Sequence, residues 1–229
     1  MSGTRRVLEF AAAAGVERLL YLSSGAVYGP QPPALAALPE DHAGAPDSLA
    51  AEAVYAHAKR LAESLCVAAG GRRLQPVIAR GFAFVGPLLP LDAHFAVGNF
   101  LRDALAGRPI EVLSDGRTVR SYMHAVDLTI WLTTLLVRGA PGRAYNVGSD
   151  RAVSVAELAG LVAACATPPL PVRVRDPAGP GPAPRYVPAI DRARSELGLE
   201  LAVGLPEALA RTFAWARREQ STLPLHKAS

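Results

Sequence analysis

Two side chains four residues apart could carry out proton transfer. Tyr55 and Lys59 belong to the stretch Tyr-Ala-His-Ala-Lys in a segment with a helical pattern. Residues i and i+4 lie on one face of a helix, so the phenol and the ammonium group project into the same space. A nearby cation stabilises a phenolate, and lowering the pKa of a tyrosine from about 10 to about 7 requires roughly 4 kcal/mol. Such a tyrosine can act as a general acid and base between a hydroxyl and a carbonyl group.

The same spacing also occurs by chance on solvated helices. Of the 24 lysines and arginines in the chain, however, only Lys59 and Lys227 are lysines, and Lys59 is the one in the interior of the sequence. That contrast favours a functional interpretation of the pair.

Three further groups of polar residues follow predicted strands or loops. Ser23 and Ser24 come directly after an apolar segment, and sites in parallel sheets form at the carboxyl ends of strands. Ser24 could hydrogen-bond a substrate oxygen there, although an ordinary turn would have the same residues. Arg80 begins Arg-Gly-Phe-Ala-Phe-Val-Gly-Pro at a second strand end, and Arg120 begins Arg-Ser-Tyr-Met-His-Ala-Val-Asp. Arg120 could bind a diphosphate through two N–H groups, or it could be a surface arginine before a helix.

Composition restricts the class of protein. The chain has 229 residues, of which 50% are hydrophobic and 19% charged, so it can build a sizeable core and cannot be extensively disordered. The net charge is +4, but no basic run with interleaved aromatic residues occurs, so we expect no nucleic-acid partner. The longest lipophilic run covers residues 128–137, whereas a membrane span needs about 20 residues, so we expect no membrane partner.

The two cysteines, Cys66 and Cys165, lie in apolar runs with a helical pattern. That placement is typical of free thiols in a reducing compartment, and it favours a cytoplasmic location. No Cys/His cluster occurs in the sequence, so we expect no metal site.

Alternating elements must position these residues. Helices are predicted over about 4–14, 48–69, 94–106, 125–138, 154 onward, and 206–218. Thr4 is expected to cap the first of them, and Ser154 with Glu157 forms a capping box at the start of the fifth. Strands are predicted over 18–23, 76–80, 110–113 and 145–147. Residues 168–188 contain eight prolines and are predicted to be loops. Strands alternating with helices predict an α/β fold with a parallel sheet.

Together, the motifs resemble the extended short-chain dehydrogenase/reductases, the nucleotide-sugar epimerase/dehydratase family. They occur in the family's order: SSxxVYG at 23–29, YxxxK at 55–59, RxxxxxGP at 80–87, RxYxHxxD at 120–127, NVGS at 146–149, VSVxEL at 153–158, and Arg185-Tyr186 ahead of SELGL at 195–199. The resemblance covers nearly the whole chain, from Gly3 to about Arg218.

The resemblance implies the C-terminal portion of a Rossmann-type parallel-sheet domain with a small substrate-binding lobe. Residues 1–150 would be the partial Rossmann-type domain, with lobe insertions around 86–120, and residues 151–229 mainly the lobe and C-terminal helices. The implied activity is that of an NAD(P)-dependent epimerase or 4-reductase acting on a nucleotide-diphosphate sugar. NAD or NADP would be the cofactor, and the protein would form a homo-oligomer.

The resemblance also implies roles for individual residues. The catalytic group is Ser24, Tyr55 as the acid and base, and Lys59, which lowers the pKa of Tyr55 and holds the nicotinamide ribose. The cofactor would contact Ser23, Tyr55, Lys59, Phe82 and Ala83. The nucleotide sugar would contact Ser24, Asn99, Arg120 and Arg185. His94 would either cap a helix in contact with solvent or touch the substrate.

Two departures from the family pattern bear on the function. Dehydratases carry an Asp-Glu pair where this chain has Gly25 and Ala26, so epimerase or reductase chemistry is favoured. In addition, no GxxGxxG or GxGxxG occurs in these 229 residues, and the chain begins about where the family's fourth helix begins. Such a glycine loop holds the dinucleotide pyrophosphate at a helix N-terminus. We therefore expect this chain alone to bind a dinucleotide weakly or not at all.

Three explanations of the missing glycine loop stay open. The start site could be misassigned, or the chain could be a fragment. The truncation could instead be natural, in a protein that acts with a partner or is an inactive pseudoenzyme. Finally, the protein could reuse the sugar-binding lobe without redox chemistry.

The predicted strand at 18–23 would also be left at an open sheet edge, bordered by Leu19, Leu20 and Leu22. An unpaired edge is a template for association. The resemblance also implies dimerisation through the helices at about 4–14 and 48–69, whose small residues Ala11, Ala14, Ala58 and Ala62 would permit close packing of a second chain. Both features predict self-association.

Overall fold

The computed structural model describes residues 2–93, 95–176 and 179–222, the last three of these without their side chains. Its centre is a parallel three-stranded sheet with the order β1-β2-β7. The strands are β1 (Arg18–Ser24), β2 (Gln75–Gly81) and β7 (Ala144–Val147). Their register aligns Ser23 with Arg80 and Arg80 with Asn146, so the polar residues of three strands meet at the carboxyl ends.

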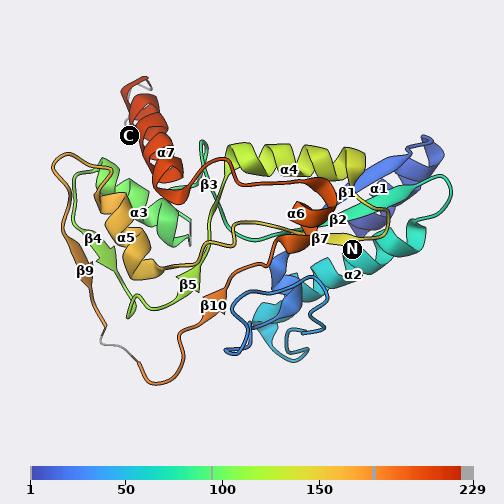
Figure 1. The fold of residues 1–229 in the computed structure, drawn as a ribbon, viewed down its shortest axis with the longest axis horizontal. Coiled ribbons are helices and arrows are strands. Elements are labelled where there is room, and N and C mark those ends of the chain that lie inside the picture. The colour runs from blue at the N-terminus through green and yellow to red at the C-terminus, as the bar shows by residue number, and fades with distance from the viewer. Residues whose placement is uncertain (1, 94, 177–178, 223–229) are drawn as a thin grey trace, which may run out of the picture.

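Helices cover both faces of this sheet (Figure 1). On one side lie α1 (Ser2–Ala13) and α2 (Val54–Ala69), and on the other lie α4 (Ala125–Arg138) and the short α6 (Asp191–Leu197). Successive strand residues point to opposite faces. Ile78 accordingly packs with Leu8 and Cys66 below the sheet, whereas Val77 packs with Trp131 above it. The result is a helix–sheet–helix sandwich whose strand ends remain free for a site.

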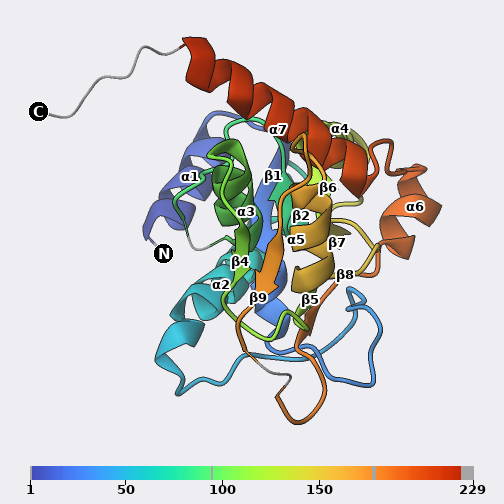
Figure 2. The same cartoon turned by 90° about the vertical axis from the view of Figure 1, so that its left-hand side faces the viewer.

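A second hydrophobic cluster forms a lobe beside the sheet, to the left in Figure 1. Its elements are α3 (Ala96–Leu105), β4 (Ile110–Val112), α5 (Val155–Ala163), β9 (Val172–Val174) and α7 (Leu205–Thr222). Strand β4 pairs with β9 in parallel, and α7 lies across the lobe in Figure 2. Five two-residue strands lie between the sheet and the lobe: β3 (Phe84–Val85), β5 (Val119–Arg120), β6 (Met123–His124), β8 (Val153–Ser154) and β10 (Arg185–Tyr186). Two 3-10 turns, η1 (Gly25–Tyr28) and η2 (Ala51–Ala53), lie between β1 and α2.

The predicted α/β fold with a parallel sheet is confirmed, and so is the Ser154–Glu157 capping box of α5. The expected start of the long helix near residue 48 is wrong. Asp47 Oδ1 accepts a hydrogen bond from the amide of Leu49 at 2.9 Å, and the chain makes the separate turn η2 before α2 begins at Val54. The expected cap at Thr4 is also wrong, because α1 begins at Ser2.

Strand β1 is the outer strand of the sheet and pairs with β2 alone among the described strands. Leu22 on this strand is 46% exposed, as an open edge predicts. The expectation that Ala11 and Ala62 offer a surface to a second chain is wrong, since both are buried inside this chain. These alanines instead allow α1 and α2 to pack closely against each other and against the sheet.

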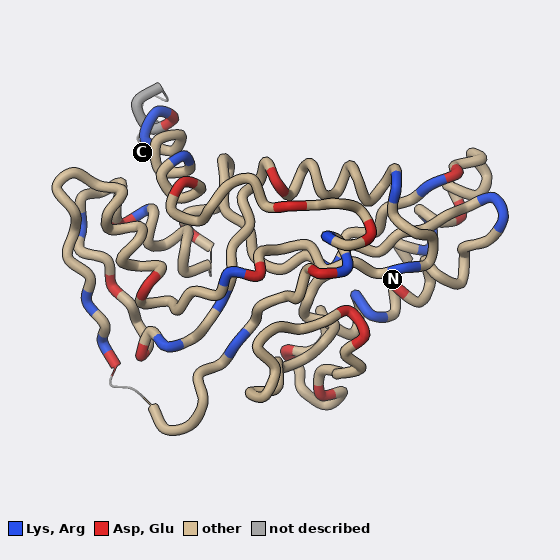
Figure 3. The backbone as a smooth tube through the Cα atoms, viewed as in Figure 1, with Lys and Arg blue, Asp and Glu red and all other residues tan. Residues whose placement is uncertain are grey.

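In the part of the chain that the structure describes, no helix is both long and apolar enough to cross a bilayer. A search of the same residues finds no cluster of three or more His, Cys, Asp or Glu side chains that could hold a metal ion. Figure 3 shows arginines in both the sheet region and the lobe, with acidic residues between them.

Candidate active site

Tyr55 and Lys59 lie together on α2, beside the carboxyl end of β1. The Lys59 ammonium nitrogen is 5.8 Å from the centre of the Tyr55 ring. It donates a hydrogen bond to the Leu22 carbonyl at 2.7 Å and lies 5.1 Å from the Tyr21 ring. Tyr55 is 57% exposed. The geometry that the four-residue spacing predicts is therefore present, and the phenol is open to a ligand.

Helix α2 is held against the strand ends by a buried ionic network around Glu63. Arg80 donates to both carboxylate oxygens, from Nε to Oε1 at 3.0 Å and from Nη2 to Oε2 at 2.7 Å. Ser23 Oγ donates to Oε1 at 2.5 Å. Arg80 also donates to the Tyr28 hydroxyl at 2.9 Å, and Tyr28 donates to Asn146 Oδ1 at 2.8 Å. The network thus joins helix α2 to all three strands.

Burial opposes the charge of Arg80, but its bonds to Glu63 and Tyr28 outweigh that effect and raise its pKa. Burial raises the pKa of the Tyr28 phenol, because it disfavours the charged phenolate. The arginine stays charged and the phenol neutral at ordinary pH. The sequence analysis missed Glu63, although its position four residues after Lys59 places it on the same helix face. Ser23 is buried with its hydroxyl bonded to Glu63, so its side chain is used within the network.

Ser24 ends β1 and caps the turn η1. Its Oγ accepts a hydrogen bond from the Ala26 amide at 3.2 Å, which fixes the serine at the entrance of the loop. The Tyr186 hydroxyl of β10 lies against the next residue, Gly25, 2.5 Å from where a Cβ atom of that residue would be. The loop after β1 is therefore in contact with β10.

A cavity of about 1030 Å³ lies between the lobe and the end of β2. A volume of this size suits a ligand somewhat larger than a drug-sized molecule. Four of the predicted site residues line it: Phe82, Ala83, Asn99 and Arg120. Other lining residues were not assigned from the sequence and include Phe84, Arg102, Thr118, Tyr122 and Tyr186.

Aromatic rings and a guanidinium are stacked along one wall of this cavity. The Phe82 and Tyr186 ring centres are 4.6 Å apart, and the Arg120 guanidinium lies 5.3 Å from the Tyr186 ring centre. Burial raises the pKa of Tyr186 and of Tyr122 to about 12, so both phenols are neutral at ordinary pH. Arg120 is the charged group of the wall, and its guanidinium can bind phosphate oxygens.

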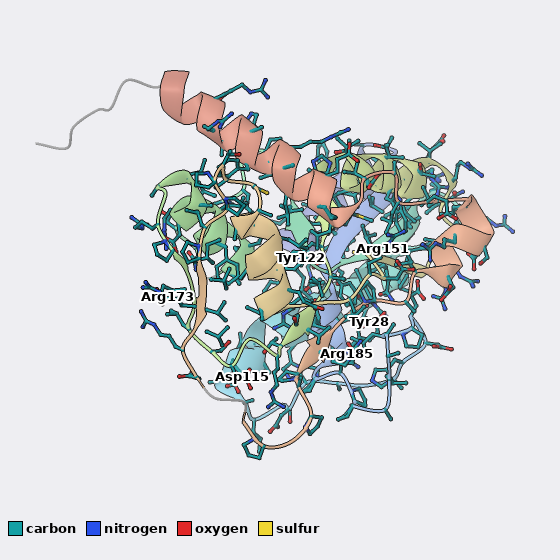
Figure 4. The ribbon with its side chains drawn as sticks, turned by 60° about the vertical axis from the view of Figure 1, so that its left-hand side comes forward. Tyr28, Asp115, Tyr122, Arg151, Arg173 and Arg185 are labelled. Atoms are coloured by element: carbon teal, nitrogen blue, oxygen red, sulfur yellow. The ribbon has the colours of Figure 1, made fainter. Side chains whose placement is uncertain are left out.

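The structure brings the predicted residues together in two adjoining groups. Ser24, Tyr55 and Lys59 lie at the end of β1, and the four cavity residues lie beyond Tyr186. Arg185, labelled in Figure 4 with Tyr122, does not line the cavity. It donates to the Ala36 carbonyl at 3.2 Å, and its buried Nε has no hydrogen-bond partner among the described residues. His94 lies outside the described residues.

Curated proteins resemble this chain over most of its length. UDP-glucuronic acid decarboxylase 1 of Xenopus tropicalis is 28% identical over 218 residues, a match that covers 95% of this chain and 51% of that protein. UDP-glucuronic acid decarboxylase 4 of Arabidopsis thaliana is 30% identical over 231 residues, covering 96% of this chain and 51% of the relative. The chain therefore spans about half the length of these curated relatives.

Two solved structures share the fold. UDP-glucose 4-epimerase of Thermotoga maritima, solved with UDP-glucose, superposes with a TM-score of 0.82 over 95% of this chain and 69% of its own, at 23% identity. MoeE5, solved in complex with UDP-glucuronic acid and NAD, is 30% identical with a TM-score of 0.76, covering 94% of this chain and 70% of its own.

The model of the NAD dependent epimerase/dehydratase family matches residues 1–148, which is well over half of the 229 residues. That match includes the strand end with Ser24, the Tyr55–Lys59 pair and the Arg120 motif. The chain belongs to the NAD-dependent epimerase/dehydratase family.

Proposed function

We propose that this chain binds a nucleotide-diphosphate sugar and provides the proton-transferring group of an NAD-dependent enzyme that epimerises or reduces the sugar. The observation that carries the proposal is the continuity of the site. The exposed Tyr55–Lys59 pair lies at the end of β1, and Tyr186, whose hydroxyl lies against Gly25 just after this strand, also lines the cavity that contains Arg120. A ligand with a sugar at one end and phosphates at the other matches that order of groups.

In this proposal, Tyr55 accepts the proton of a sugar hydroxyl while the carbon that bears it is oxidised to a ketone. Lys59 stabilises the phenolate that begins the step, since its ammonium group is 5.8 Å from the ring centre. Ser24 holds the sugar oxygen from the end of β1. When the ketone is reduced again, Tyr55 returns the proton to the new hydroxyl. An epimerase would give the new hydroxyl the opposite configuration, whereas a reductase would convert a ketone substrate to a single alcohol.

The residues present fit one end of a dinucleotide. The nicotinamide supplies the hydride acceptor and donor when bound. In this proposal, Lys59 and Tyr55 contact its ribose, and Phe82 with Ala83 lies against the nicotinamide ring. The 229 residues contain no glycine-rich motif for the pyrophosphate, so NAD or NADP is proposed to bind this chain weakly.

A second candidate reaction is decarboxylation of a nucleotide-activated uronic acid. The curated relatives named above are UDP-glucuronic acid decarboxylases at 28–30% identity, which favours it. A ketone formed next to the carbon that bears a carboxylate gives a β-keto acid, which loses carbon dioxide. This step needs no Asp-Glu pair, and it is therefore compatible with Gly25 and Ala26.

Product analysis distinguishes these reactions from a non-enzymatic nucleotide-sugar-binding protein. The chain is incubated with NAD and either UDP-glucose or UDP-glucuronic acid, and the sugars are separated by chromatography with mass detection. A change of configuration supports epimerisation, and release of carbon dioxide supports decarboxylation. Either activity must disappear in Tyr55→Phe. A chain that binds the UDP-sugar but leaves both substrates unchanged is a binding protein without redox activity. A chain that binds neither substrate contradicts the proposal.

A further inference from the structure

His124 is a buried histidine at the start of α4, and one of its ring nitrogens lacks a partner. The residue is only 3% exposed. Its Nδ1 accepts a hydrogen bond from the Val126 amide at 3.3 Å, so the side chain caps the helix. Because Nδ1 accepts this bond, the ring is neutral and carries its hydrogen on Nε2. Nε2 is buried and has no hydrogen-bond partner among the described residues.

His124 lies where the sheet layer meets the lobe. It ends the short strand β6, which pairs with β3 and packs against α4 and α7. In the first turn of α4, the buried Asp127 accepts hydrogen bonds from the Ala202 and Val203 amides at 3.1 Å each. Those amides directly precede α7, which begins at Leu205. The start of α4 therefore holds the last helix of the lobe, and we call this contact the junction.

Charged groups on both helices of the junction face the imidazole. Asp127 belongs to α4, and Glu207 and Arg211 belong to α7, where they form an i,i+4 ion pair. The two carboxylates favour a protonated ring, and the guanidinium disfavours it. Strand β3, Phe84–Val85, adds no charge. Burial is the largest effect and, together with Arg211, lowers the pKa of His124 below its ordinary value of 6.5.

We propose that His124 makes the junction acid-sensitive, so that its protonation loosens α7 from the sheet layer. A proton on Nδ1 turns the acceptor of the Val126 amide into a donor, and α4 loses its cap. The charged ring then faces Arg211 and the positive end of a helix in a place with little access to water, and all three conditions oppose it. The same first turn carries Asp127, so the loss of the cap disturbs its bonds to the segment before α7. This role is independent of the proposed function.

The pH dependence of denaturant unfolding tests this role. The unfolded chain takes up the proton near pH 6.5 and the folded chain only at a lower pH, so stability falls as the pH drops through 6.5. From pH 7.5 to 5.5, such a histidine raises the unfolding equilibrium constant by at most about tenfold. We expect at least about threefold from His124, measured as the difference between the wild type and His124→Asn.

Two substitutions separate this histidine from the other titrating groups. In His124→Asn, the asparagine oxygen can still cap a helix but does not titrate. The remaining carboxyl and imidazole groups are common to the variant and the wild type, so their contributions cancel in the difference. His57→Asn is the matched control, because His57 is not buried and lies on α2, across the sheet from α4. It should keep the full pH dependence of the wild type.

NMR of the unsubstituted chain tests the same role without relying on a variant that folds. The His124 ring should titrate below pH 6.5. Hydrogen exchange at the Val126 amide, corrected for its intrinsic rate, should accelerate over the same pH range, and so should exchange at Ala202 and Val203. Titration at pH 6.5 or above, or unchanged protection of these amides while the ring titrates, would overturn the proposal. The same pH dependence in the wild type and His124→Asn, or its loss in His57→Asn, would also overturn it.

Discussion

Among the charged side chains near the site, we expect the Glu63 carboxylate to contribute most to the free energy of unfolding. The Arg80–Glu63 ion pair makes two hydrogen bonds, and its side chains are only 16% and 12% exposed. Replacing one partner leaves the other charge buried without compensation, which costs about 3–5 kcal/mol. Glu63→Gln keeps an amide oxygen that can accept one bond from Arg80 or Ser23, so we expect the lower end, about 3 kcal/mol.

Denaturant unfolding followed by circular dichroism measures this change. For a domain of this size, the expected loss corresponds to a melting temperature lower by about 6–12 °C. Glu207→Gln is the matched control, because its i,i+4 pair with Arg211 is more than half exposed and should contribute less than about 0.5 kcal/mol. Replacing both partners, as in Glu63→Leu with Arg80→Met, should destabilise less than Glu63→Gln alone. A loss below about 1 kcal/mol for Glu63→Gln would refute this reasoning.

Three further predictions concern the lobe and the sheet edge. Ser154→Ala removes the N-cap of α5 and should cost about 1 kcal/mol in thermal unfolding; an unchanged melting temperature would show that the cap is dispensable. The pKa of Asp115 is lowered from 3.8 to about 2 by its hydrogen bonds, so the bond that it accepts from the Gly179 amide should persist above pH 4 and be lost toward pH 2. Hydrogen exchange at Gly179, corrected for its intrinsic rate, should then match that of Asp115→Ala, and protection that persists at pH 2 would contradict this. The chain should self-associate at micromolar concentration through the open edge of β1, and Leu22→Lys should shift sedimentation toward monomer; a wild-type chain that is already a stable monomer would contradict this.

Local sequence patterns predicted the helices and strands that are long enough to show a periodic hydrophobic pattern. The i,i+4 spacing of Tyr55 and Lys59 predicted a shared helix face, and the two side chains do lie together. The apolar segments at β1 and β2 predicted parallel strands, and the structure confirms their pairing. Strand β2 is buried, but the prediction that β1 is buried is wrong, because this edge strand is mostly half-buried. Strands such as β3 and β10 span two residues, too few for any periodicity, and depend on pairing with distant segments.

Contacts between distant segments account for what the sequence could not predict in the site. Tyr186 was noticed only as a neighbour of Arg185, and the roles of the two differ because β10 turns Tyr186 into the cavity and directs Arg185 to the Ala36 carbonyl. The clash that a side chain at Gly25 would meet comes from residues 82 and 186, so no local pattern could reveal it. Both features are properties of the packed molecule.

In the proposed function, the cavity lined by Arg120 binds a nucleotide-diphosphate sugar. Calorimetric titration of the full chain with UDP-glucose, UDP-glucuronic acid and NAD measures this binding. We expect both UDP-sugars to bind more tightly than NAD, and Arg120→Ala to weaken them by about tenfold or more, the effect of losing charged hydrogen bonds to phosphate. Arg138→Ala, an exposed arginine at the end of α4, should leave all three affinities unchanged. Micromolar binding of NAD without binding of either UDP-sugar, or UDP-sugar affinities that are unaffected by Arg120→Ala, would contradict the account.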